Sequence, residues 1–171
     1  DAADGERVEP GSAHTPLAVM LVLTQAAIGA TWGDALLQTV APGVSPVTAS
    51  LVPSLALAVA LPGLAASVAH LGRPQWAFRA VLGLRTSWMS REIVVLGAFA
   101  GALTMLFGVA WIEVAGFGDS LPFASLAAAV RVPLAWSTAA LGAIGLFCSA
   151  QIYAATRRPL WTCLLYTSPS P

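Results

Sequence analysis

The 171-residue chain is 57% hydrophobic and only 9% charged, with eight arginines, no lysine and a formal net charge of zero. Its mean hydropathy of +0.78 is typical of a polytopic membrane protein and excludes an ordinary soluble domain. Nothing in this charge balance favours nucleic-acid binding, and two cysteines without a CxxC pair cannot build a zinc or iron–sulfur site.

The two ends differ in composition from the middle of the chain. Residues 1–15 are rich in acidic residues and begin without an initiator methionine, so we expect a tail or linker cut from a longer chain. Residues 163–171 change composition abruptly and resemble a translated sequencing adapter, so we set them aside as a non-native sequence artefact. Cys148 then remains as a small buried apolar residue, and the fold is expected in residues 16–162.

Four apolar stretches are long enough to cross a hydrocarbon layer of about 30 Å, which takes about 20 helical residues. Each stretch is apolar all round, as expected for helices that face both lipid and neighbouring helices. The fold class is therefore an all-α, polytopic transmembrane helix bundle, and Pro53 and Pro62 predict a kink in its second span. The four spans are predicted at approximately 16–37, 50–71, 92–112 and 133–156.

Three links join the spans: a Gly/Pro-rich link at 33–48, an Arg-rich loop, and a link at 113–131 in which residues 121–130 could form a brief interfacial helix. Glycines also recur within the third and fourth spans. Such spacing favours close helix packing, although ordinary membrane composition produces it too. The pairs are Gly97 with Gly101 and Gly142 with Gly145.

The loop between the second and third spans is the main candidate site. Residues 70–93 hold four of the eight arginines, one of the two histidines and a single glutamate. Ionisable groups near hydrocarbon cost free energy, and they usually occur where they bind a ligand or transfer a proton. This polar cluster therefore predicts a functional site at one end of the bundle.

Three segments of this loop carry a family resemblance: HLGRP at 70–74, AFRA at 77–80 and RTSWMSREI at 85–93. They resemble the loop between the second and third helices of the dimethyl sulfoxide reductase anchor subunit family. The resemblance extends more weakly to residues 16–25 and 152–159. Family members have about eight helices, so the four spans here resemble their N-terminal half.

The resemblance implies the membrane anchor subunit of a molybdoenzyme complex that oxidises quinol, either menaquinol or ubiquinol, in anaerobic respiration. The implied partners are an iron–sulfur electron-transfer subunit, a molybdopterin catalytic subunit and membrane lipid. Because those subunits would carry the cofactors and the terminal reduction, we expect no haem, iron–sulfur cluster, molybdopterin or other metal in this chain. The implied location is the cytoplasmic (inner) membrane of a prokaryote.

Oxidation of a quinol releases two electrons and two protons, so its site needs a group that accepts a hydrogen bond and then a proton. Histidine, which titrates near neutral pH, suits this role, and a nearby carboxylate can orient the imidazole or pass the proton to water. His70 and Glu92 match family positions linked to quinol binding and are the candidate catalytic residues. The expected quinol-binding set is His70, Arg73, Ser90, Arg91 and Glu92, and the expected partner-docking residues are Arg79 and Arg85.

The same residues also have structural interpretations. His70 could cap the end of its helix. Glu92 could be a charge at a helix N-terminus, stabilised by the macrodipole and by Arg91, an effect worth up to about 1 kcal/mol. Trp76 and Trp88 fit an interfacial aromatic belt.

Two other function classes remain. A haem-containing or polysulfide-reductase-type anchor is conceivable because His14 and His70 would share one side of the membrane. A transporter fragment is disfavoured because the spans carry only weak polar groups, such as Gln25 and Thr104, near their midplanes. The signals for topology conflict, because the positive-inside rule places the polar loop in the cytoplasm, whereas the corresponding loop of the resembled family faces the periplasm.

Overall fold

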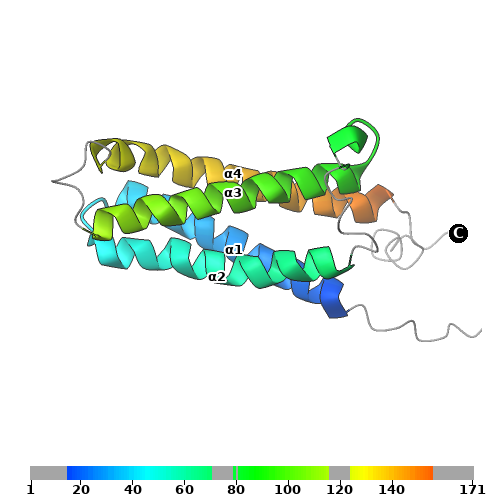
Figure 1. Cartoon of the computed structure of the whole chain (residues 1–171), viewed down its shortest axis with the longest axis horizontal. Coiled ribbons are helices and arrows are strands. Elements are labelled where there is room, and N and C mark those ends of the chain that lie inside the picture. The colour runs from blue at the N-terminus through cyan, green and yellow to red at the C-terminus, as the bar shows by residue number, and fades with distance from the viewer. Residues whose placement is uncertain (1–14, 71–78, 80, 116–123, 156–171) are drawn as a thin grey trace, which may run out of the picture.

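The computed structural model describes residues 15–70, 79, 81–115 and 124–155, without side-chain detail for 15–17, 68–70, 124 and 153. The four helices are α1 (Thr15–Val40), α2 (Pro46–His70), α3 (Trp88–Val114) and α4 (Ala124–Ala155). Figure 1 shows them side by side in an elongated antiparallel bundle. The predicted all-α bundle of four helices is confirmed. Apart from Thr15, the expected tail lies outside the described residues, as does the whole segment 163–171.

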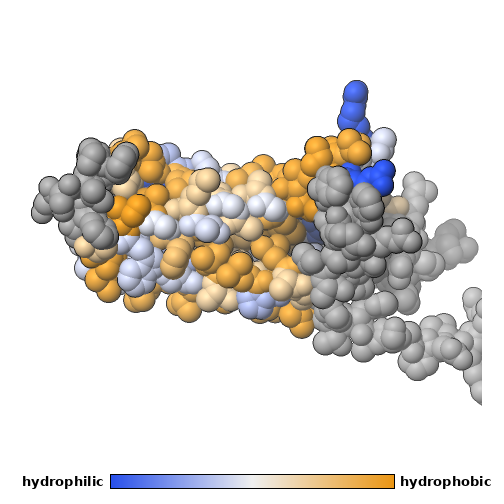
Figure 2. Space-filling view, in the orientation of Figure 1, coloured by the Kyte–Doolittle hydropathy of each residue, from blue (hydrophilic) through white to orange (hydrophobic). Residues whose placement is uncertain are grey.

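The described helices are long and apolar enough to cross a membrane, with candidate spans Ala18–Val40, Pro46–Ser67, Trp88–Val114 and Ser125–Ile152. Large hydrophobic side chains are exposed along their outer surfaces, as Figure 2 shows in orange. Lipid tails provide an apolar environment for such side chains, whereas water does not.

The bundle closes as a ring in which α1 packs on α2, α2 on α3, α3 on α4, and α4 on α1. Alanine supplies much of the interior, and small side chains allow helices to approach closely in membranes. Larger side chains fill the remaining space. Two buried clusters form this core: Ala27, Ile28, Ala56, Ala60, Phe99 and Leu103 in one, and Ala35, Leu106, Ala135 and Ala139 in the other.

Local capping extends two helices beyond their predicted starts. Ser87 has an extended backbone (φ −125°, ψ 124°) and its side chain accepts a hydrogen bond from the backbone N–H of Ser90, so α3 begins at Trp88 instead of residue 92. Ser45 accepts from the backbone N–H of Thr48 at 3.2 Å, and α2 begins at Pro46, where a missing N–H costs nothing. α2 runs on through both of its internal prolines.

The link between α1 and α2 is shorter than the predicted 33–48, because α1 continues to Val40. The largest correction concerns α4, which begins at Ala124 and runs through Pro133 without a break. Residues 124–130 are therefore its first turns, not a separate interfacial helix. Arg131, which suggested a polar link in the sequence, lies inside the helix because Glu113 neutralises its charge.

The two glycine pairs have different surroundings. A Cβ at Gly142 would lie 2.9 Å from Ile28 Cγ1 and 3.2 Å from Phe99 Cε2, and one at Gly145 would lie 2.6 Å from Leu96 Cδ2. The second pair therefore does allow α4 to pack closely on α1 and α3. Gly97 and Gly101 are exposed, with nothing within 4 Å of an added Cβ, so the first pair makes no such contact within the described residues.

Candidate functional site

The start of α3 lies at the end of the bundle where α2 ends (Figure 1), and Glu92 lies one turn inside α3. Its carboxylate accepts a short hydrogen bond from the hydroxyl of Ser149 on α4. Ser149 is 7% exposed, and its neighbour Cys148 is also buried. Two helices that are distant in sequence thus hold a carboxylate at a fixed position in largely apolar surroundings.

The observed start of α3 does not favour the interpretation of Glu92 as a charge that compensates the helix macrodipole. Because α3 begins four residues earlier than predicted, the first turn contains no acidic residue and Glu92 is not placed to compensate the helix macrodipole there. Arg91 does not pair with it either. The Arg91 Nε donates to the Leu84 carbonyl at 2.8 Å and its Nη2 to the Arg85 carbonyl at 3.2 Å.

Arg91 instead holds the end of the polar loop against α3. Besides the two carbonyl contacts, its guanidinium lies 4.3 Å from the ring centre of Trp88, a typical cation–π geometry. Trp88 in turn meets Phe147 of α4 edge to face at 6.0 Å between ring centres. Arg91, expected in the quinol-binding set, therefore has a structural role that orders the turn before α3.

Ser90 is half-buried beneath the short 3₁₀ turn at 81–83. A Cβ at Gly83 would lie 2.5 Å from Ser90 Oγ, so the turn approaches α3 this closely because residue 83 is glycine. Ser90, Arg91 and Glu92 are thus consecutive residues at one end of the bundle whose side chains contact different neighbours.

The other predicted site residues are only partly described. His70 is the last residue of α2, at the same end as Glu92, but its side chain lies outside the described part of the chain. Arg73 lies wholly outside it. Arg79 and Arg85 are exposed in the described part of the polar loop between α2 and α3, at the end of the bundle where Figure 2 shows a strongly hydrophilic region. That exposure is compatible with their expected docking role.

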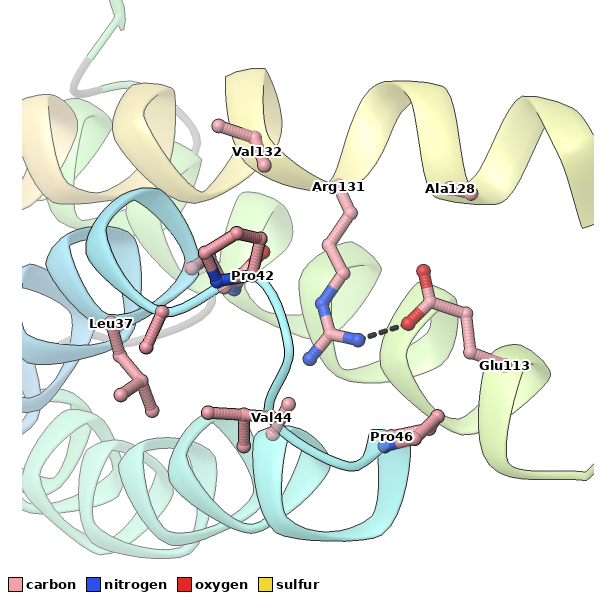
Figure 3. A pocket seen from close by; sticks show the side chains of 11 residues that line it. Leu37, Pro42, Val44, Pro46, Glu113, Ala128, Arg131 and Val132 are labelled. Atoms are coloured by element: carbon pink, nitrogen blue, oxygen red, sulfur yellow. Dashed lines mark hydrogen bonds and ion pairs between the residues drawn. The ribbon is translucent and has the colours of Figure 1, made fainter.

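A second polar cluster, which the sequence reasoning missed, lies near the opposite end of the bundle. Asp34 on α1 is fully buried and accepts a hydrogen bond from Gln38 Nε2 at 2.5 Å. Arg131 on α4 forms an ion pair with Glu113 on α3, with 8% and 20% of the two side chains exposed (Figure 3). Asp34, which lies inside the first predicted span, was the available signal, because charged residues are rare in membrane helices and usually face the bundle interior.

A cavity of about 350 Å³ adjoins this second cluster. Most of its wall is apolar and comes from α1, α2, α4 and the link between α1 and α2, while three polar side chains converge on it (Figure 3). The lining residues are Leu37, Gln38, Ala41, Pro42, Val44, Pro46, Ala49, Glu113, Ala128, Arg131 and Val132. Within the described ranges, no group of three or more His, Cys, Asp or Glu side chains could hold a metal ion.

Four apolar helices with an arginine-bearing turn at one end define a multi-pass membrane protein. The family model of the DMSO reductase anchor subunit (DmsC) matches residues 8–168, so the chain belongs to this family. The resemblance inferred from residues 70–93 is thereby confirmed.

One curated relative is a sulfite dehydrogenase subunit of Allochromatium vinosum, which is 44% identical over 108 residues. The match covers 60% of this chain and 31% of that relative, so the chain corresponds to about a third of the relative's length. No solved structure matches the chain significantly. The chain therefore corresponds to part of a membrane anchor subunit of the DMSO reductase family.

Proposed function

We propose that this chain provides the quinol site of its complex, at the end of the bundle where α2 ends and α3 begins. There a quinol is oxidised to the quinone, its two electrons pass to an iron–sulfur subunit, and its two protons leave through His70 and Glu92. A molybdopterin catalytic subunit would then use the electrons to reduce the terminal acceptor. The clusters and the molybdopterin belong to those partners in this proposal.

The single observation that supports this proposal most is the position of Glu92. A carboxylate beside lipid is costly unless it has a partner, and here the neutral hydroxyl of Ser149 holds it without cancelling its charge. Such a carboxylate can accept a proton and release it to water at the membrane surface. Because α2 ends at His70 on the same side, a quinol head group could meet both residues while its tail stays in lipid.

The relative from Allochromatium vinosum supports a second candidate, in which electrons flow in the opposite direction. Its name describes a sulfite dehydrogenase, and oxidation of sulfite supplies electrons. A complex of that kind containing this chain would reduce quinone to quinol, taking up two protons and two electrons at the same site. Both candidates use His70 and Glu92, and they differ only in the direction of electron flow.

The test compares two reactions of the assembled complex in membranes. One is oxidation of a quinol analogue, and the other is reduction of the terminal acceptor by an artificial dye that feeds the partner subunits directly. We expect His70→Ala and Glu92→Gln each to reduce quinol oxidation at least tenfold, because proton transfer by a positioned side chain contributes about 10²-fold or more. Dye-driven activity should be unchanged at matched assembly levels.

Ser149→Ala should reduce quinol oxidation less strongly, because it releases Glu92 without removing it. Ser137→Ala is a matched control, since Ser137 is an exposed serine on the same helix that donates only to the Pro133 carbonyl. Unchanged quinol oxidation in both His70→Ala and Glu92→Gln would exclude this end of the bundle as the quinol site. Reduction of a quinone analogue with sulfite as electron donor, without the quinol-driven reaction, would select the reverse direction.

A further inference from the structure

The second polar cluster contains buried polar atoms without partners, and two of the residues that carry them, Gln38 and Arg131, line the cavity. Among the described residues, Asp34 Oδ1, Gln38 Oε1, Arg131 Nε and Arg131 Nη2 form no hydrogen bond. Asp34 is 0% exposed and Arg131 is 7% exposed. Buried polar groups without hydrogen bonds are costly, and more so within a membrane, so an occupant that bonds to these atoms is expected.

The unpaired atoms define the chemistry of this occupant. Two are acceptors, the oxygens of Asp34 and Gln38, and two are donors on the Arg131 guanidinium. A lipid tail offers neither donors nor acceptors. An anion would meet the carboxylates of Asp34 and Glu113, and a metal cation would meet Arg131. Water both donates and accepts, and a cavity of 350 Å³ has room for about ten molecules at roughly 30 Å³ each.

The charges of the cluster do not balance. Arg131 on α4 carries one positive charge, whereas Asp34 on α1 and Glu113 on α3 carry two negative charges when ionised. The residues of α2 at this end add the hydroxyl of Ser50 but no titratable group. One proton would therefore make the cluster neutral. Glu113 is already paired with Arg131, which leaves Asp34 as the carboxylate that gains most from binding it.

We propose that this cavity is a hydrated proton-binding site, open to the membrane face opposite the polar loop. In this proposal water enters between the link of α1 and α2 and the first turns of α4, which Figure 3 shows on two sides of the cavity, and reaches the lining residues Gln38 and Arg131. A hydronium ion gives its proton to the Asp34 carboxylate and remains as water. Gln38 lines the cavity and bonds to Asp34, so it connects the carboxylate to the hydrated space.

This site is separate from the one proposed around Glu92. A buried apolar layer that includes Ile28, Phe99 and Leu103 lies between the two ends of the bundle. The inference therefore does not depend on quinol chemistry. Within the described residues, the cavity is closed at its inner end by this apolar layer.

Water access can be tested by cysteine labelling of the assembled complex in sealed vesicles, with native cysteines replaced by serine. Ala49→Cys lies on α2 in the cavity wall and is 6% exposed, while Ala56→Cys lies on the same helix in the apolar core and is 1% exposed. A charged methanethiosulfonate reagent added from the face opposite the polar loop should modify Ala49→Cys at least tenfold faster than Ala56→Cys. Leu37→Cys, which also lines the cavity and is half-buried, serves as a second reporter if the first variant does not assemble.

Proton binding can be tested in the unaltered complex with dicyclohexylcarbodiimide, which couples to protonated carboxyl groups in apolar surroundings. Mass spectrometry should find the adduct on Asp34 and not on Glu113, and Asp34→Asn should abolish it. Equal, slow labelling of the cavity and core cysteines would overturn the hydrated cavity. A hydrated cavity without an adduct on Asp34, or with one on Glu113 alone, would overturn the proton-binding role.

Discussion

Replacement of Gly142 by alanine tests a close approach of α4 to two neighbouring helices. The added Cβ would lie 2.9 and 3.0 Å from the two γ carbons of Ile28 and 3.2 Å from Phe99 Cε2. Ordinary contacts between carbon atoms are about 3.5–4.0 Å. Ile28 and Phe99 are 5% and 0% exposed, so neither has free space to move into. Overpacking of this kind costs about 1–3 kcal/mol, against which the higher helix propensity of alanine returns at most about 1 kcal/mol.

We therefore expect Gly142→Ala to lower the free energy of unfolding by about 1–2 kcal/mol, measured by reversible unfolding in mixed micelles. Gly101→Ala is the matched control, because Gly101 is an exposed helical glycine with nothing within 4 Å of the added Cβ. Its stability should stay within about 0.5 kcal/mol of the parent or increase slightly. If both variants lost the same stability, or if Gly142→Ala lost none, the packing of α4 against α1 and α3 described above would be wrong.

Three further predictions concern the polar contacts. Arg131→Met should destabilise the bundle by about 3–5 kcal/mol because it leaves Glu113 without its partner, and the double variant Arg131→Met, Glu113→Gln should lose less than the sum of the single losses in the same unfolding assay. Ser149→Ala should cost about 1.5–3 kcal/mol through loss of a hydrogen bond to a charged group, and a loss below about 0.5 kcal/mol would argue against the bond to Glu92. Arg91→Lys replaces the planar guanidinium with an ammonium group that cannot bond to both backbone carbonyls in the same way. Amide hydrogen exchange in the turn before α3 should therefore accelerate, and unchanged exchange would contradict the ordering role of Arg91.

The sequence predicts the architecture well because each span is a continuous apolar stretch, which is the strongest signal that a membrane protein offers. The helix ends were less predictable, because they depend on local contacts. Ser87 and Ser45 each cap a helix through one hydrogen bond, and each moves a helix start by four residues. The two glycine pairs show a further limit: only the rotation of each helix in the bundle decides which pair meets a neighbour.

The candidate site was only partly predictable. The motif around Glu92 identified its family and its location, but Ser149 lies 57 residues away and no local pattern connects the two. Arg131 was missed because it was interpreted as part of a polar link, and the glutamate that allows it inside a helix comes from α3. Asp34 lies inside the first predicted span, but the sequence does not show that Arg131 of α4 lies at the same end of the bundle. Pairings between distant helices are what the structure adds to the sequence.

The length of α4 has a consequence for the depth of its charged residue. Thirty-two residues make a helix of about 48 Å, which exceeds a hydrocarbon thickness of about 30 Å by some 18 Å. At the usual tilt of about 20° most of this hydrophobic mismatch persists, so each end of the helix projects several ångströms beyond the acyl chains when the excess is shared equally. Arg131 lies seven residues, or about 10 Å, from the first residue of α4. Its guanidinium thus belongs near the level of the lipid headgroups, where the bilayer itself is already hydrated.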